Sequence, residues 1–292
     1  MKVELNQHVD YTGLEDHQKY FYHWIMERER ARIGRESNTP KPWTNDPIIQ
    51  SYRFCNVRRE DDTVTKWIHQ NWIHQFQHRV EAKRLVLTMI IARTVNHVDT
   101  LRAIGFPVNG FHDYLENARV VMKNRRAAKQ QVWTGAYLVS TNGHSVDKVD
   151  YILDRVWMPF YEKGRAPEEG ETLAHYHAYL MNFDGLGSFM AGQVIADIKF
   201  SSVMAKAQDW HSWAPIGPGS KRGLNRYFGR PPEAPIKTKT VHEELLVLQC
   251  AVQQRCGIQL AVHNIQNSCC EFDKYLRTLY GEGTPRSTYS GK

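Results

Sequence analysis

The sequence has few of the features that mark secreted, membrane-spanning or zinc-dependent proteins. Its 292 residues include five cysteines with no CxxC pair and no disulfide-like spacing: Cys55, Cys250, Cys256, Cys269 and Cys270. No apolar run approaches the roughly 20 residues that cross a bilayer. The opening MKVELNQHVDYTG also lacks the apolar core of a secretory signal. We therefore expect a protein of a reducing, cytoplasmic compartment without a membrane partner.

Metal and nucleotide motifs are also missing. The 14 histidines contain no HExxH, and His175 and His177 stand two apart on an expected helix, where they face different directions. No GxxxxGK[ST] loop is present, so a P-loop kinase activity is not expected. We predict no metal site, and no cofactor is firmly implied.

Strand-like alternation is scarce, and helical periods dominate the chain. Apolar residues recur at steps of three and four between 64 and 80, as on one face of an amphipathic helix. The next stretch, 85–95, is more apolar and predicts a buried helix. Further helices are expected at 20–33, 146–161, 172–181, 188–200, 241–254 and 269–280. The breakers between them are short, so we predict one all-α domain over 1–292.

The charge balance favours an anionic partner. Lys and Arg number 38 against 31 acids, a formal net charge of +7. A basic surplus attracts polyanions over long range. Many basic proteins bind no nucleic acid, so this observation supports a DNA partner without establishing one.

Residues 183–198, FDGLGSFMAGQVIADI, have the pattern of a helix-hairpin-helix. Gly185 and Gly187 would form a tight turn, and Ser188 would begin a helix of small residues whose N-terminal N–H groups point at a DNA phosphate. An ordinary helix–helix turn is the alternative, because Gly-x-Gly alone is a weak signal. The region 170–230 contains this motif and the next one.

Residues 217–230, GPGSKRGLNRYFGR, combine glycines with cations. Exposed N–H groups at a glycine-rich turn beside several cations suit a phosphate. The candidate phosphate-binding residues are Gly217, Gly219, Ser220, Lys221, Arg222 and Arg226. A basic helix start with ordinary surface charges is the alternative.

The N-terminal segment 1–63 is rich in arginine and aromatic residues towards its end. Aromatic rings interleaved with arginines can stack on an extruded base while the charges hold phosphates. The candidate base or donor pocket consists of Tyr52, Arg53, Phe54, Asn56 and the more distant Tyr227. A folded loop braced by salt bridges among Arg59, Glu60 and Asp61 is the competing interpretation.

Candidate acids and bases lie in two places. Asp197 and Asp209 follow the hairpin and could be catalytic, surface or salt-bridging carboxylates. Near the C-terminus, Glu271, Asp273 and Lys274 lie on an expected helix, with Arg277 further along. These side chains could stabilise the helix through i,i+4 pairs, or bind an amine substrate or a leaving phosphate.

Taken in order, YRFCNVRREDD, FDGLGSFMAGQVIADI, GPGSKRGLNRYFGR and EFDKYLRTLYGEGTPRS resemble phage enzymes of thymine hypermodification. These are described as alpha-glutamyl/putrescinyl thymine pyrophosphorylases or amino acid:DNA transferases, and they are similar to the helical domain of 5-hydroxymethyluracil DNA kinases. The resemblance extends over residues 20–289. It implies a helical fold like that of the helix-hairpin-helix DNA glycosylases, and a protein of the bacterial host cytoplasm.

The resemblance also implies a reaction. A kinase would phosphorylate or pyrophosphorylate 5-hydroxymethyluracil in double-stranded DNA, and an enzyme like this one would replace the phosphate with the amine of an amino acid or polyamine. The resemblance also implies that Gly217 stands where glycosylases have their excising Asp, although Asp209 could still supply a carboxylate. A DNA glycosylase or lyase and a non-catalytic DNA-binding module are the rival classes.

Roles for individual residues follow as expectations of that reaction. Asp209 or Asp197 would act as general base on the incoming ammonium, and Arg59 would hold an amino-acid carboxylate. Lys221, Arg222 and Arg226 would neutralise the leaving phosphate. Stacking partners of the extruded base would be Tyr52, Phe54 or Tyr227.

Overall fold

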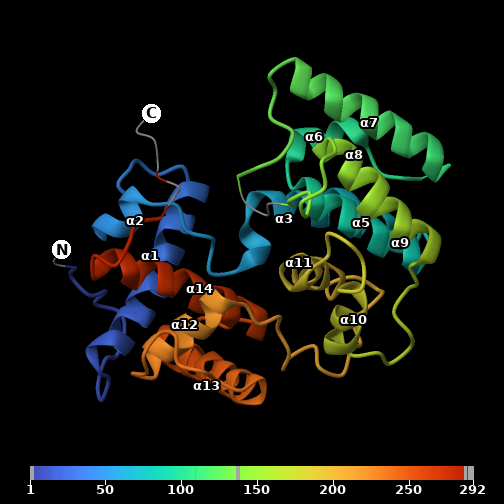
Figure 1. The fold of residues 1–292 in the computed structure, drawn as a ribbon. Helices are drawn as coiled ribbons and strands as arrows, with labels where there is room; N and C mark the ends of the chain where they lie inside the picture. Colours follow the sequence, from blue (N-terminus) through green and yellow to red (C-terminus); the bar gives the residue numbers. More distant parts are fainter. Residues whose placement is uncertain (1–2, 109, 136–138, 286–287, 289–292) are drawn as a thin grey trace. The chain divides into compact units, whose positions relative to one another are not determined.

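The structure is a computed structural model that describes residues 3–108, 110–135, 139–285 and 288. Helices of several kinds make up the secondary structure of these residues (Figure 1). The described part of the chain contains no strand, only an isolated bridge between Tyr52 and Thr288. The predicted all-α class is therefore confirmed. None of the described helices combines the length and apolarity that crossing a membrane requires.

The chain forms two compact units, where the sequence predicted one domain. Unit 1 comprises Met1–Asp62 and His211–Lys292, and unit 2 comprises Thr63–Trp210. The end of the predicted N-terminal segment 1–63 falls at the first boundary. The predicted region 170–230 is divided, because its hairpin belongs to unit 2 and GPGSKRGL belongs to unit 1.

Unit 1 is organised around its last long helix, α14. This helix contacts α1, α2, α12 and α13, and its buried positions recur at helical spacing. The elements of the unit are α1 (Asp16–Glu36), α2 (Pro47–Ser51), η1 (Arg59–Asp61), α12 (Pro218–Tyr227), α13 (Thr238–Cys256) and α14 (Val262–Leu279).

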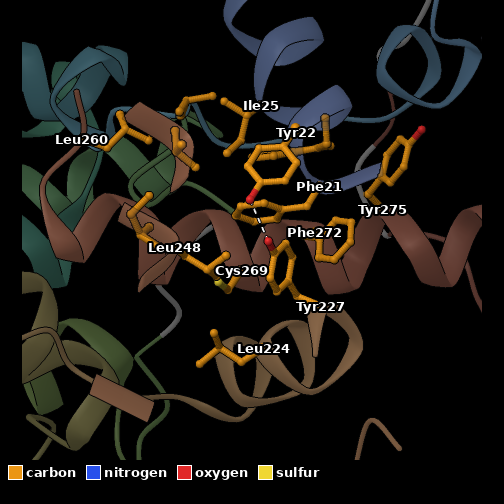
Figure 2. Close-up of a cluster of buried hydrophobic side chains, with 14 of the residues drawn as sticks. Phe21, Tyr22, Ile25, Leu224, Tyr227, Leu248, Leu260, Cys269, Phe272 and Tyr275 are labelled. Carbon is orange, nitrogen blue, oxygen red and sulfur yellow. Dashed lines mark hydrogen bonds between the residues drawn. The ribbon is translucent and has the colours of Figure 1, made fainter. Parts of the chain in front are cut away.

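Aromatic side chains fill the core of unit 1. The ring of Phe21 lies 5.3 Å from that of Tyr227 and 5.1 Å from that of Phe272, both edge to face (Figure 2). The hydroxyls of Tyr22 and Tyr227 are 2.6 Å apart, so the two buried phenols satisfy each other. Full burial of each such side chain contributes roughly 1.5–3 kcal/mol.

Two glycines let α12 approach α14 closely. A Cβ on Gly219 would lie 2.5 Å from the Cys270 Sγ, and a Cβ on Gly223 would lie 1.9 Å from the Cys269 carbonyl oxygen. Most of the expected phosphate-binding turn is therefore a helix, as the alternative interpretation of a basic helix start required. Gly219 and Gly223 have a packing role, since any side chain there would push the helices apart.

Unit 2 has a nearly fully buried helix, α5, at its centre. Residues 85–95 are all buried, which confirms the predicted buried helix, and α11 packs against it. Its elements are α3 (Thr63–Ile68), η2 (His69–Ile73), α4 (His74–Phe76), α5 (Ala82–Val95), α6 (Val98–Ile104), α7 (Phe111–Ala127), α8 (Lys148–Tyr151), η3 (Ile152–Trp157), α9 (Met158–Lys163), α10 (Leu173–Leu180) and α11 (Ser188–Ile198).

The expected helices are present, but two of them are interrupted, and further helices occur that were not predicted. The helix expected over 64–80 is interrupted by the π-helical turn η2, and that over 146–161 by the π-helical turn η3. The helix α7 was not predicted. Its buried residues Phe111, Tyr114, Leu115, Ala118 and Met122 do have helical spacing, but charged residues between them obscure the pattern.

The turn η1 is attached to α14 by a polar cluster. The Glu60 carboxylate accepts hydrogen bonds from His263 Nε2 at 2.6 Å and from Asn264 Nδ2 at 2.9 Å. The Asn264 Oδ1 accepts the Arg59 backbone N–H at 3.0 Å. Burial opposes ionisation of Glu60, but the bonds from His263 and Asn264 outweigh it and lower its pKa to about 2.

The close packing of α12 predicts the effect of Gly223→Ala. The added methyl would overlap the Cys269 carbonyl, and we expect the free energy of unfolding to fall by roughly 1–3 kcal/mol in urea titrations. Gly217→Ser is the matched control, since a Cβ at Gly217 meets no atom within 4 Å and serine suits an N-cap. Equal stability of the two variants would contradict this packing.

The Glu60 cluster predicts a pH dependence. The pKa of Glu60 is about 2 in the folded protein against 4.5 ordinarily. The stability that ionised Glu60 adds to the folded protein is therefore complete above pH 4.5 and is lost as the pH falls towards 2. We expect Glu60→Gln to cost about 2–3 kcal/mol at pH 7 and much less at pH 2.5. Urea unfolding at both pH values measures this, and a pH-independent cost would refute the linkage.

Candidate active site

A cavity of about 340 Å³ lies in unit 1 between α12, α14 and the segment after α14. It is lined by Arg222, Cys270, Glu271, Asp273, Lys274, Arg277, Gly283, Thr284 and Pro285. Three cations and two carboxylates therefore line one small cavity. Four of these five charged groups were among the predicted site residues, and they come from the GPGSKRGL motif and the C-terminal motif.

Asp273 connects the two motifs. Its carboxylate is buried and accepts hydrogen bonds from Arg222 Nε and Arg226 Nε, each at 2.9 Å. Arg226 also forms an ion pair with Glu282, and only 8% of its side chain is exposed. Arg226 thus links Asp273 of α14 to Glu282 and fixes this wall of the cavity. Arg222, in contrast, is 27% exposed and lines the cavity.

Glu271 and Lys274 form a second pair on the same helix. Lys274 Nζ lies 2.9 Å from Glu271 Oε2 and donates to the Arg53 carbonyl at 2.6 Å. The Cys55 backbone N–H donates to the same Glu271 oxygen at 3.1 Å. The motif YRFCNVRREDD therefore contacts the C-terminal motif through its backbone.

The thiol in the cavity is not a nucleophile at neutral pH. Burial, together with the negative charges of Glu271 and Asp273, raises the pKa of Cys270 to about 12. Burial and the charge of Glu271 also raise the pKa of Cys55 well above its ordinary value. Both thiols therefore stay protonated at neutral pH.

Several predicted pocket residues belong to the core. Phe54 is 6% exposed and packs against Trp24 and Tyr275, and Tyr227 is also 6% exposed. The prediction that Phe54 or Tyr227 stacks on a base is therefore wrong, because neither ring presents a face to solvent. Tyr52 is partly buried in the bridge to Thr288, and Arg53 is exposed.

The remaining residues of that segment support the folded loop rather than an open pocket. Asn56 is 1% exposed and accepts a hydrogen bond from Arg28, and Arg59 is 5% exposed. Two ion pairs join the segment to α1, from Arg58 to Glu29 at 3.2 Å and from Asp61 to Arg32 at 3.4 Å.

At the start of α12 the predicted phosphate-binding residues have different environments. Ser220 is fully buried, and its hydroxyl donates to the Gly217 carbonyl at 2.9 Å and accepts the Gly217 N–H at 3.2 Å. Ser220 is therefore a capping residue. Lys221 is partly exposed one residue further along.

The hairpin is a feature of unit 2. Helices α10 and α11 flank the turn, and Gly185 has φ +74°, a conformation that favours glycine. A Cβ on Gly185 would also lie 2.6 Å from Val156 Cγ2. Gly187 is the N-cap of α11, and Gly187 and Ser188 are both exposed. The backbone N–H groups at this terminus are therefore near the surface.

Two candidate catalytic aspartates have structural partners within unit 2. Asp209 caps α10, accepting the N–H groups of Leu173 at 2.7 Å and Ala174 at 2.9 Å. Asp197 is completely buried, and its carboxylate accepts hydrogen bonds from Arg93 and from His69 at 3.2 Å. Because Asp197 is completely buried, it cannot contact a DNA substrate. Its predicted role as a general base is therefore wrong.

Sequence reasoning missed one aromatic side chain of this region. Trp43 lies in the proline-rich stretch TPKPWTNDP, where the prolines suggested only a loop. It borders a separate cavity of unit 1. The available signal was a tryptophan two residues from a lysine, Lys41. No three His, Cys, Asp or Glu side chains in the described ranges are grouped as metal ligands.

Comparisons with known proteins support one part of the resemblance, the relation to the helical domain of 5-hydroxymethyluracil DNA kinases. Residues 15–284 match the family described as "5-hmdU DNA kinase, helical domain". The 5-hmdU DNA kinase of Bacillus phage SP10 is 28% identical over 300 residues, covering 91% of this chain and 45% of the kinase. The chain thus spans less than half the length of that relative. No solved structure matches it. The chain belongs to the family of the helical domain of 5-hmdU DNA kinases.

Proposed function

We propose that the protein transfers an amine from an amino acid or polyamine onto phosphorylated 5-hydroxymethyluracil in DNA. The observation that carries this proposal is the unit 1 cavity, which joins three cations to two carboxylates in about 340 Å³. The related phage protein is named for a kinase of 5-hmdU DNA. A kinase of that kind would supply the phosphorylated base as substrate.

The cations suit the leaving group. Arg222, Lys274 and Arg277 line the cavity, and a phosphate or pyrophosphate that departs from the methylene carbon gains negative charge as the bond breaks. Charge-assisted hydrogen bonds to that developing anion stabilise the transition state more than the ground state. Lys221 and Arg226 then have supporting positions on α12, the helix that carries Arg222.

Glu271 is the better general base of the two carboxylates. Both oxygens of Asp273 are held by arginines. The described hydrogen bonds of Glu271 instead both fall on Oε2. Its Oε1 is therefore the atom proposed to take a proton from the incoming ammonium. An amino-acid donor could also place its carboxylate on Lys274 or Arg277.

The proposed step conserves atoms and charge. The carbon–oxygen bond between the methylene and the phosphate breaks, and its electron pair leaves with the phosphate. The amine lone pair forms the new carbon–nitrogen bond. One ammonium proton goes to Glu271 before the amine attacks. The new nitrogen–carbon bond leaves the nitrogen positively charged, and it then loses a second proton to solvent to give a neutral product.

The hairpin supports DNA as the partner. An exposed Gly187–Ser188 helix start presents N–H groups to anions, and the net charge of +7 favours polyanions. Asp209 holds α10 at the other end of the hairpin, which makes it a positioning residue in this proposal.

The reaction is tested by incubating the protein with DNA that contains mono- or pyrophosphorylated 5-hydroxymethyluracil and a pool of amino acids and polyamines. After digestion, mass spectrometry of the nucleosides should detect an amine adduct. We expect Glu271→Gln and Arg222→Gln each to lower its rate about 100-fold or more.

Arg230→Gln is the matched control. Arg230 lies just beyond α12 and pairs with Glu244 rather than with the cavity, so its loss should leave the rate within about twofold. Release of free base would identify a glycosylase instead. If the nucleosides are unchanged with every donor but the protein binds DNA in a salt-sensitive way, the protein is a non-catalytic DNA-binding module.

A further inference from the structure

Trp43 is held in one position on the surface of α1. Its Nε1–H donates to the Thr39 carbonyl at 2.7 Å. A Cβ on Gly34 would lie 2.7 Å from the Trp43 Cδ1, so the absent side chain at Gly34 is what allows the indole to rest against the helix. A ring fixed in this way loses little conformational freedom when a ligand binds.

The ring borders a cavity of about 370 Å³ within unit 1. The lining residues are Ala31, Lys41, Pro42, Trp43, Thr44, Ile49 and Gln50. Ala31 and Ile49 are buried and supply an apolar surface. Lys41 Nζ lies 5.2 Å from the centre of the Trp43 ring. The lining contains one cation and no carboxylate, unlike the cavity beside α14.

Gln50 adds a carboxamide to the lining of this cavity. Its Nε2 donates to the Thr44 carbonyl at 2.6 Å, which uses one of the two N–H groups of the carboxamide. A carboxamide also carries an acceptor oxygen and a second N–H. A uracil-type base has the complementary donor and acceptor, N3–H and O4, on one edge.

We propose that this cavity binds an unpaired pyrimidine nucleotide of the DNA strand, with the base stacked on Trp43 and the phosphate near Lys41. The nucleotide is identified by three requirements of the lining: a flat apolar face for the indole, a polar edge for Gln50 and a negative charge for Lys41. The assignment of the base to DNA rests on the proposed function. The nucleotide is distinct from the leaving phosphate, which the α14 cavity holds.

The stacking platform thereby differs from the one that the sequence suggested. Phe54 and Tyr227 are buried in the core, whereas Trp43 is partly exposed and borders a cavity. Stacking on an aromatic side chain stabilises a bound base without selecting its sequence strongly. This site therefore holds the strand, and the charged cavity performs the chemistry.

Photocrosslinking tests the placement. The full 292-residue protein is irradiated with a single-stranded oligonucleotide that carries 5-iodouracil, and the cross-linked peptide is identified by mass spectrometry. We expect the cross-link at Trp43. Cross-links confined to other residues, or none at saturating protein, would overturn the proposal.

Binding of the same oligonucleotide, without iodine, provides a second measurement. Trp43→Ala should weaken binding about tenfold, and Trp43→Phe should restore most of it, because a stacking face is retained. Trp133→Ala is the matched control, since Lys148 likewise lies over that ring, at 4.4 Å, outside this cavity. Equal affinities for Trp43→Ala and Trp133→Ala would refute the site. These measurements need no amine donor, so failure of amine transfer leaves them interpretable.

Discussion

The close contact between α12 and α14 is the constraint on which the unit 1 site depends. Gly219 and Gly223 stand four residues apart on one face of α12, and neither position has room for a Cβ against Cys270 and Cys269. Because the helices approach this closely, Arg222 and Arg226 reach Asp273 with hydrogen bonds of 2.9 Å each. A wider spacing would separate these arginines from their carboxylate and open the wall of the cavity.

Within this arrangement Arg226 maintains the structure, whereas Arg222 both pairs with Asp273 and lines the cavity. Asp273 is buried and paired with two arginines, and removal of one partner from such a cluster is costly because a charge remains unpaired in a poorly solvated place. Arg226 is compensated again by Glu282. Arg222, Lys274 and Arg277 line the cavity, and the fixed wall positions them before any ligand arrives.

The sequence predicted the helical class because apolar spacing near 3.6 is local information. The largely apolar stretch 85–95 likewise predicted the buried helix α5. The sequence also identified Arg222, Glu271, Asp273 and Lys274, which the fold brings to one cavity. It could not predict what buries Asp197 or Tyr227, because Arg93 and Tyr22 are distant in sequence. Glycine in GPGSKRGL was equally ambiguous: a missing side chain serves a phosphate or a neighbouring helix, and only the packing of α14 distinguishes them.

The charge pattern of the unit 1 cavity favours substitution over base excision. Excision builds positive charge on the sugar and calls for an unpaired carboxylate, but Asp273 is neutralised by two arginines, and Glu271 is paired with Lys274. With three cations and two carboxylates, the lining carries a net charge of +1. Such a site stabilises a departing anion better than a developing cation. In the proposed reaction a phosphate leaving group fits this field, and the proton moves through a charged side chain because the Cys270 thiol stays protonated.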